Sequence, residues 1–171
     1  MNKASIIKWL ELKPHPLEGG YFCRTYTSDV SCNAPDLEDF RAIMSSIYYM
    51  LTDENPLGYL HFNKSDIIHY FHQGSPILYT IIRPNGELHQ VVLGPELDKG
   101  QQLQLLVKGG SWKASELLAG EFGLISEAVT PGFDYRDNIL ACDKTIKSAY
   151  PEHWPAISKY IKATSHQACI I

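Results

Sequence analysis

Residues 58–74 read Gly58-Tyr59-Leu60-His61-Phe62-Asn63-Lys64-Ser65-Asp66-Ile67-Ile68-His69-Tyr70-Phe71-His72-Gln73-Gly74. Aromatic and branched residues fill both ends of this stretch, and a polar segment lies between them, which predicts two strands joined by a turn. Side chains two positions apart on a strand share a face. His61 and Asn63 therefore share a face of the first strand, and His69 shares a face of the second with Ile67 and Phe71. We expect His61, Asn63 and His69 to point into the interior of the fold.

Similar segments recur on both sides of this stretch. Asn85-Gly86 and Gly109-Gly110 each predict a tight turn between two consecutive strand-like segments, because these residues tolerate positive φ. Strands at this spacing predict a sandwich or a closed barrel. A polar loop is expected at 28–39, and helices are expected at the start of the chain and at 151–161. The predicted strands are 21–27, 41–52, 58–62, 67–72, 77–83, 88–93, 102–107, 111–117 and 122–129.

Composition narrows the class of protein. The 171 residues have the size of one domain, and we expect 1–171 to form a single domain. A net charge of −4 without a Lys/Arg cluster argues against a nucleic-acid partner and against an anionic membrane surface. No apolar run reaches the roughly 20 residues of a membrane span, so a soluble, cytoplasmic protein is expected. The four cysteines form no CxxC pair, which favours reduced thiols.

The chain also resembles a known family. The opening stretch is similar to the first cupin motif, with His61 at its first histidine and Gly74 at its last glycine, although Gly58 does not match the opening glycine. Further segments resemble the Cupin-5 family, a group of RmlC-like cupins of unknown function, over about residues 15 to 137. The resemblance implies an all-β cupin-type double-stranded β-helix, a jelly-roll barrel with short N- and C-terminal helices. The matching segments include Glu18-Gly19-Gly20-Tyr21-Phe22, Ser45-Ser46-Ile47-Tyr48-Tyr49-Met50-Leu51, Gly110-Ser111-Trp112-Lys113-Ala114 and Val129-Thr130-Pro131-Gly132-Phe133-Asp134-Tyr135.

The metal ligands of the cupin pattern are largely replaced. The resemblance implies a metal held by two histidines, a glutamate and a further histidine, and this chain keeps His61 but has Asn63 and Ile67 at the next two places. An isoleucine cannot bind a metal, and an amide oxygen is a weak ligand. We therefore expect no metal or other cofactor. A divalent metal held by His61, His69 and Glu127 remains the alternative.

Two residues are candidates for catalysis. His69 has an ordinary pKa near neutral pH and is predicted to act as a general base, with Tyr79 on the neighbouring strand as a donor of a proton or hydrogen bond. RmlC-type epimerases use a comparable His/Tyr arrangement, so the resemblance implies an isomerase-like activity. The alternative for His69 is that it packs as an aromatic residue would.

Four further residues are predicted to bind a small-molecule ligand. These are His61 and Asn63 on the inward face, Trp112 as a wall of the pocket, and Glu127 as a polar group within it, because a buried carboxylate needs a partner. For Trp112 the alternative is a place in the core, and for Glu127 a solvated position.

Three functions remain open from the sequence. The first is a metal-independent isomerase or epimerase acting on a sugar- or nucleotide-linked substrate. The second is a ligand-binding sensor or carrier without catalysis, and the third is a metal-dependent enzyme such as an oxygenase. We also expect a homodimer, formed through the long aromatic strand Ile43–Leu51 as a sheet edge.

Overall fold

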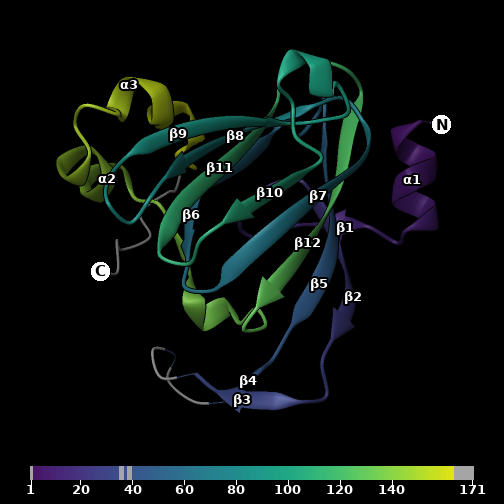
Figure 1. Ribbon diagram of the computed structural model, residues 1–171. Coiled ribbons are helices and arrows are strands. Elements are labelled where there is room, and N and C mark those ends of the chain that lie inside the picture. Colours follow the sequence, from purple (N-terminus) through teal and green to yellow (C-terminus); the bar gives the residue numbers. More distant parts are fainter. Residues whose placement is uncertain (1, 35–36, 38–39, 164–171) are drawn as a thin grey trace.

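Two antiparallel sheets face each other in the computed structural model, which describes residues 2–34, 37 and 40–163 (Figure 1). All strand pairs within these two sheets are antiparallel. The six-stranded sheet has the order β1 (Lys13–Pro14), β2 (Tyr21–Thr27), β5 (Ser45–Thr52), β12 (Phe122–Thr130), β7 (Asp66–Gly74) and β10 (Gln104–Val107). The five-stranded sheet has the order β13 (Asn138–Leu140), β6 (Leu57–Asn63), β11 (Ser111–Leu117), β8 (Ile77–Ile82) and β9 (Leu88–Leu93).

The remaining elements are short. The strands β3 (Ser31–Asn33) and β4 (Phe40–Ala42) pair with each other and project beyond the barrel at the bottom of Figure 1. The helices are α1 (Lys3–Trp9), α2 (Asp143–Ala149) and α3 (Trp154–Ile157), with single 3₁₀ turns η1 (Leu97–Lys99), η2 (Tyr135–Asp137) and η3 (Ser158–Tyr160).

Alternation along the strands builds the core between the sheets. Leu51, Tyr79, Leu93 and Ile125 point inward and are almost completely buried in one cluster. Full burial of a side chain of this size stabilises a fold by roughly 1.5–3 kcal/mol. The inward positions that continue this pattern toward one end of the barrel carry polar side chains instead, and these form the candidate site.

The outward faces of both sheets are covered by helices. Ile6 of α1 packs with Met50 and Leu124 on the outside of the six-stranded sheet. Ile146 of α2 and Ile157 of α3 belong to a separate cluster with strand residues of the five-stranded sheet. Figure 1 shows α2 and α3 beside β8 and β9, and α1 on the opposite side of the molecule. The expected jelly-roll barrel with short terminal helices is confirmed.

Three details of the expected secondary structure are wrong. The predicted strand 41–52 is two strands, β4 and β5, and part of the expected loop 28–39 is β3, because β4 turns away from the sheet to pair with it. The tail also contains α2, which the sequence reading missed.

The strand expected to form a dimer is not a sheet edge. β5 pairs with β2 on one side and with β12 on the other, so its backbone groups are already satisfied. Edge-to-edge pairing of two copies would have to use other strands, and the homodimer itself stays a prediction.

The structure also bears on the expectation of reduced thiols. Cys23 and Cys32 are free thiols, whereas Cys142 takes part in a disulfide, so the expectation of reduced thiols is wrong for Cys142.

Residues 164–171 lie outside the described residues, and the single domain 1–171 stays a prediction. In the described part of the chain, no helix is long and apolar enough to cross a membrane.

Candidate functional site

A narrow cavity lies at the polar end of the barrel interior. Its volume is about 20 Å³, which is the room needed by roughly one water molecule. It extends from buried groups such as His61 and Lys113 to the exposed side chains of Arg24 and Tyr135. Its lining consists of His15, Glu18, Phe22, Arg24, Ile47, His61, Asn63, Ile67, Lys113, Glu127, Val129, Phe133 and Tyr135.

Three charged or polar side chains from the two facing sheets meet at the buried end of this cavity. Lys113 of β11 places its Nζ atom 3.4 Å from Glu127 Oε1 of β12 and 3.4 Å from His69 Nε2 of β7. His69 Nδ1 lies 3.2 Å from the same Glu127 oxygen. All three residues are buried, so the ion pair is held out of water. A buried carboxylate and ammonium are stable together only when each has such partners.

These contacts fix the protonation of the cluster. An ammonium group only donates hydrogen bonds, so His69 Nε2 must accept from Lys113 and Nδ1 must carry the proton that is donated to Glu127. Burial, and then the nearby Lys113 charge, lower the pKa of His69 to about 4, which keeps the ring neutral at pH 7. Burial alone would raise the pKa of Glu127, but Lys113 and His69 hold it well below its usual range. The cluster therefore contains a fixed anion and a fixed cation around a neutral imidazole.

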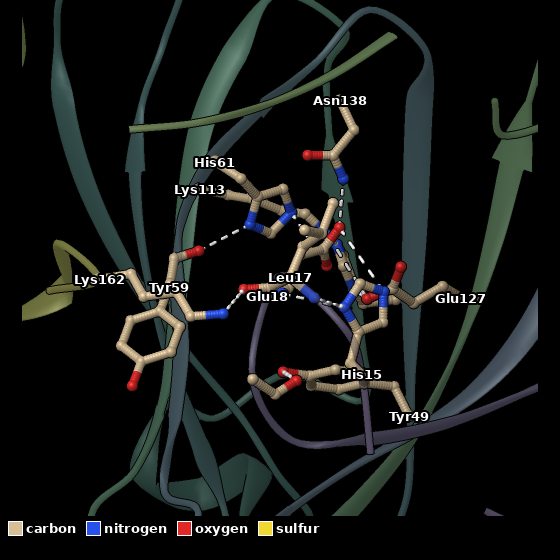
Figure 2. A network of polar contacts seen from close by, with 12 residues as sticks. His15, Leu17, Glu18, Tyr49, Tyr59, His61, Lys113, Glu127, Asn138 and Lys162 are labelled. Atoms are coloured by element: carbon tan, nitrogen blue, oxygen red, sulfur yellow. Dashed lines mark hydrogen bonds and ion pairs between the residues drawn. The ribbon is translucent and has the colours of Figure 1, made fainter. Parts of the chain in front are cut away.

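A second group, centred on Glu18, lies across the cavity. Figure 2 shows the Glu18 carboxylate between the rings of His61 and His15, with Asn138 beyond it. Asn138 Nδ2 donates to Glu18 Oε1, and His61 Nε2 lies 3.5 Å from Glu18 Oε2. His15 Nδ1 accepts the backbone N–H of Glu18 at 2.9 Å, so the proton of a neutral His15 is on Nε2, on the side of the carboxylate.

The pairing of His61 with Glu18 is incomplete. His61 Nδ1 lies 2.7 Å from the Tyr59 carbonyl oxygen, which only accepts, so Nδ1 carries the proton. Burial lowers the pKa of His61, and the Glu18 charge opposes this shift only in part. The lone pair of a neutral His61 Nε2 then faces a carboxylate oxygen. Two acceptors at this distance repel each other unless a donor, such as a ligand hydroxyl, lies between them.

The backbone of the loop before β2 sets the position of Glu18. The Tyr59 N–H donates to the Glu18 carbonyl oxygen at 2.7 Å, and Tyr49 Oη donates to the Gly19 carbonyl oxygen at 3.0 Å. Lys162 Nζ donates to the carbonyl oxygen of Leu17 at 2.9 Å. The loop is therefore tied to both sheets and to the C-terminal segment, as Figure 2 shows for Lys162 and Tyr59.

Gly19→Ala is expected to destabilise the protein strongly and to displace Glu18. Gly19 has φ of +83°, and an added Cβ would lie 2.3 Å from the Leu57 carbonyl oxygen. Gly86 is the matched control, because its φ is +85° and nothing lies within 4 Å of an added Cβ. Left-handed backbone alone costs about 1–2 kcal/mol, so Gly86→Ala should lose that much and Gly19→Ala clearly more. Urea unfolding of both variants measures the difference, and equal losses would contradict the close approach.

The mouth of the cavity is aromatic and basic. The Phe133 N–H donates to Ser45 Oγ at 2.9 Å, which fixes the segment after β12 over the opening. The Phe133 and Tyr135 rings are in edge contact, with centroids 5.0 Å apart, and the Arg24 guanidinium carbon lies 5.7 Å from the Phe133 centroid. The side chain of Arg24 is exposed, which leaves its charge accessible at the opening.

The structure separates the residues predicted from the sequence. His61, Asn63 and Glu127 line the cavity as expected. His69 and Tyr79 also point inward, and Tyr79 Oη lies 3.2 Å from His69 Nδ1, but neither residue lines the cavity. They could act on a ligand only through other residues, and their part in catalysis stays a prediction. Trp112 does not wall the cavity, because it lies on the opposite face of β11 from Lys113 and packs against Phe62.

Sequence reasoning missed several lining residues, among them Lys113, His15 and Glu18. Lys113 follows Trp112 in the sequence, so the two side chains point to opposite faces of the strand. The prediction placed Trp112 on the inward face, whereas Lys113 occupies it. The serines at positions 111 and 115 lie on the same face of the strand as Lys113, and they were the available sign that this face is polar. His15 and Glu18 reach the cavity from a loop, and the Gly19-Gly20 pair was the only local sign of a close backbone approach.

Comparison with known proteins supports the fold and identifies the family. The sequence profile of the family Cupin_5, described as "Cupin superfamily (DUF985)", matches residues 4–141. The uncharacterized protein YML079W of Saccharomyces cerevisiae is 37% identical over 134 residues, which are 71% of this chain and 66% of the yeast protein. This chain thus matches slightly less than two thirds of the length of that relative.

Two solved structures are similar over almost their whole length. A hypothetical protein from Leishmania major superposes with a TM-score of 0.88 at 28% identity, covering 94% of this chain and 99% of the other. Protein SO0799 from Shewanella oneidensis superposes with a TM-score of 0.85 at 31% identity, covering 96% and 99%. With the profile match over most of the chain, these similarities show that the protein belongs to the Cupin_5 (DUF985) family of the cupin superfamily.

Proposed function

We propose that this protein is a metal-independent enzyme of isomerase or epimerase type that acts on a small polar carbonyl compound. The observation that carries the proposal is that a proton-accepting pair, His61 with Glu18, and a fixed ammonium, Lys113, line the same cavity. Proton transfer next to a carbonyl needs a base and a cation, and these two groups supply them.

The chemistry follows from the orientation of these groups. His61 Nε2 takes a proton from the carbon beside the carbonyl, and the electron pair of the broken C–H bond moves to the carbonyl oxygen. Lys113 has three N–H groups, of which two are directed to Glu127 and His69, so the third is available to this oxygen. Glu18 stabilises the imidazolium that forms. Return of the proton to the opposite face of the same carbon, after the planar enolate turns over, gives the epimer. Delivery of the proton to the former carbonyl carbon, with the hydroxyl proton of the deprotonated carbon passing to the enolate oxygen, gives the isomer.

The dimensions of the cavity restrict the substrate. Its volume of about 20 Å³ admits only a small group, such as a carbonyl or hydroxyl, at the buried end. The rest of the substrate would lie at the mouth, where Phe133 and Tyr135 offer ring faces and Arg24 offers a cation for an anionic group. A sugar phosphate or a nucleotide-linked sugar has this combination of groups.

The residues present do not fit the metal ion that the cupin pattern implies. Asn63 Oδ1 accepts the Ser65 N–H at 3.0 Å, so the amide is engaged in a turn, and Ile67 offers no donor atom. The Lys113 ammonium already provides a positive charge beside Glu127. Within residues 2–34, 37 and 40–163, no group of three His, Cys, Asp or Glu side chains is arranged to hold a metal.

Hydrogen exchange in D₂O tests the proposal without knowledge of the product. The protein is incubated with a panel of sugar phosphates and nucleotide sugars, and NMR follows deuterium incorporation beside the carbonyl. His61→Gln removes a positioned general base, which contributes about 10²–10⁴-fold. Lys113→Met removes a donor to the developing oxyanion, which contributes about 10²–10³-fold. Each variant should therefore reduce the exchange rate by at least about 100-fold. His72→Gln is the control, because His72 is exposed and lies outside the cavity.

The alternative functions give different results. Ligand binding with no deuterium incorporation, unchanged by His61→Gln, would contradict catalysis and favour a sensor or carrier. A near-stoichiometric transition metal in protein purified without added metal, lost in His61→Ala, would favour a metal-dependent enzyme.

A further inference from the structure

A second and much larger cavity opens at the seam between the two sheets. β9 and β10 are the edge strands of their sheets, and they are joined at one end by hydrogen bonds from Gly94 N to the Gln102 carbonyl oxygen and from Gln102 N to the Val92 carbonyl oxygen, at 2.8 and 2.9 Å. Further along, the two strands enclose a cavity of about 380 Å³. Ligand pockets in proteins commonly measure about 300–1,000 Å³, so this one has room for a small organic molecule.

The lining combines an apolar floor with a basic rim. The floor comes from buried core residues, Ile81, Val91, Leu105 and Val107. The polar lining is Arg83, His89, Gln102, Lys108 and Ser111. The lining contains no Asp or Glu, although the chain as a whole has a net charge of −4. This distribution favours a ligand that has an apolar body and a negative charge.

The cations of the rim are available for exchange. Arg83 pairs with Glu87 at 3.1 Å and Lys108 pairs with Asp66 at 2.6 Å. The side chains of Arg83 and Lys108 are 44% and 65% exposed, and exposed ion pairs contribute at most about 1 kcal/mol, so a ligand anion can replace the carboxylates at little cost. The side chain of the half-buried His89 forms no hydrogen bond with the described residues, and its ring adds a further donor to the same rim.

We propose that the seam cavity is a binding site for an organic anion, in which a carboxylate, sulfonate or phosphate contacts Arg83, Lys108 and His89 while an apolar group rests on the floor. The site is distinct from the Lys113 cavity, because the two linings have no residue in common.

Fluorescence titration with 8-anilinonaphthalene-1-sulfonate, an aromatic sulfonate, tests this site. The uncharged N-phenyl-1-naphthylamine is the matched probe without the anion, and it should bind at least about tenfold more weakly. The double variant Arg83→Gln/Lys108→Gln should bind the sulfonate about tenfold more weakly than the wild type, and it should bind the uncharged probe as well as the wild type does.

A pair of leucines gives the control for location. Leu106 and Leu103 are both 49% exposed, but only Leu106 lines the cavity. Leu106→Glu should weaken sulfonate binding by about tenfold or more, because it places a carboxylate at the rim, whereas Leu103→Glu should change it less than about twofold. Equal effects of the two leucine variants, or equal binding of the two probes, would overturn the proposal. Because the variants leave His61 and Lys113 intact, the result is independent of the hydrogen-exchange test.

Discussion

Lys113→Met is expected to lower the free energy of unfolding by about 3–5 kcal/mol, the usual cost of leaving a buried charge without its partner. Lys113 is 4% exposed, and its Nζ atom is 3.4 Å from Glu127 Oε1. Methionine has a similar length and removes only the charge, so the loss reports on the uncompensated Glu127 carboxylate. Urea unfolding of the wild type and the variant at pH 7 measures it.

A second substitution separates charge from packing. In the double variant Lys113→Met/Glu127→Gln, the amide oxygen can still accept the His69 N–H, and no charge remains among the side chains at positions 69, 113 and 127. The double variant should therefore recover at least half of the lost stability. Lys108→Met is the control, because Lys108 is exposed and its ion pair with Asp66 contributes less than about 1 kcal/mol. A double variant less stable than Lys113→Met would show that Glu127 is not the group that Lys113 neutralises.

The stability of the protein should fall as the pH is lowered from 6.5 to 4. His69 has a pKa of about 4 in the folded protein and 6.5 when unfolded. Between these values the unfolded chain binds the proton and the folded chain does not, so acid favours unfolding; the contribution is complete above pH 6.5 and is lost as the pH falls through 4. A shift of this size corresponds to about 3 kcal/mol. The lowered pKa values of His61, His15 and Glu127 act in the same direction.

Urea unfolding at intervals between pH 7 and pH 4 measures this dependence. His69→Gln should be less stable at pH 7 and should lose about 3 kcal/mol less than the wild type over this range. His72→Gln, at an exposed position, should keep the wild-type dependence. A His69→Gln variant with the full wild-type slope would contradict a buried neutral His69.

Alternation of side chains made much of the barrel predictable. The strand pair within residues 58–74 is β6 and β7, and its inward residues His61, Asn63 and His69 are buried as expected. Such patterns are informative because a one-residue slip would move every apolar side chain of the strand to solvent. β11 lacks this constraint, since both of its faces are largely buried, one against the core and one against the C-terminal helices. For this reason the sequence could not decide between Trp112 and Lys113.

Contacts between distant parts of the chain were not accessible from local patterns. Glu18 meets His61 and Asn138, which are 43 and 120 positions away, only after the two sheets are assembled. β4, which turns away from the line of β5, is held by a buried two-point ion pair between Arg41 and Asp137, with Nε–Oδ2 at 3.1 Å and Nη2–Oδ1 at 3.4 Å. Neither pairing has a sequence signature, because each depends on the arrangement of strands rather than on neighbouring residues.

The proton positions on the histidine rings are the most direct test of the proposed site. Nitrogen-15 NMR of the ring nitrogens at pH 7 should find neutral His61 and His69 with the proton on Nδ1, and neutral His15 with the proton on Nε2. A charged or metal-bound His69, or a His61 with its proton on Nε2, would contradict the account of a lysine-centred, metal-free site.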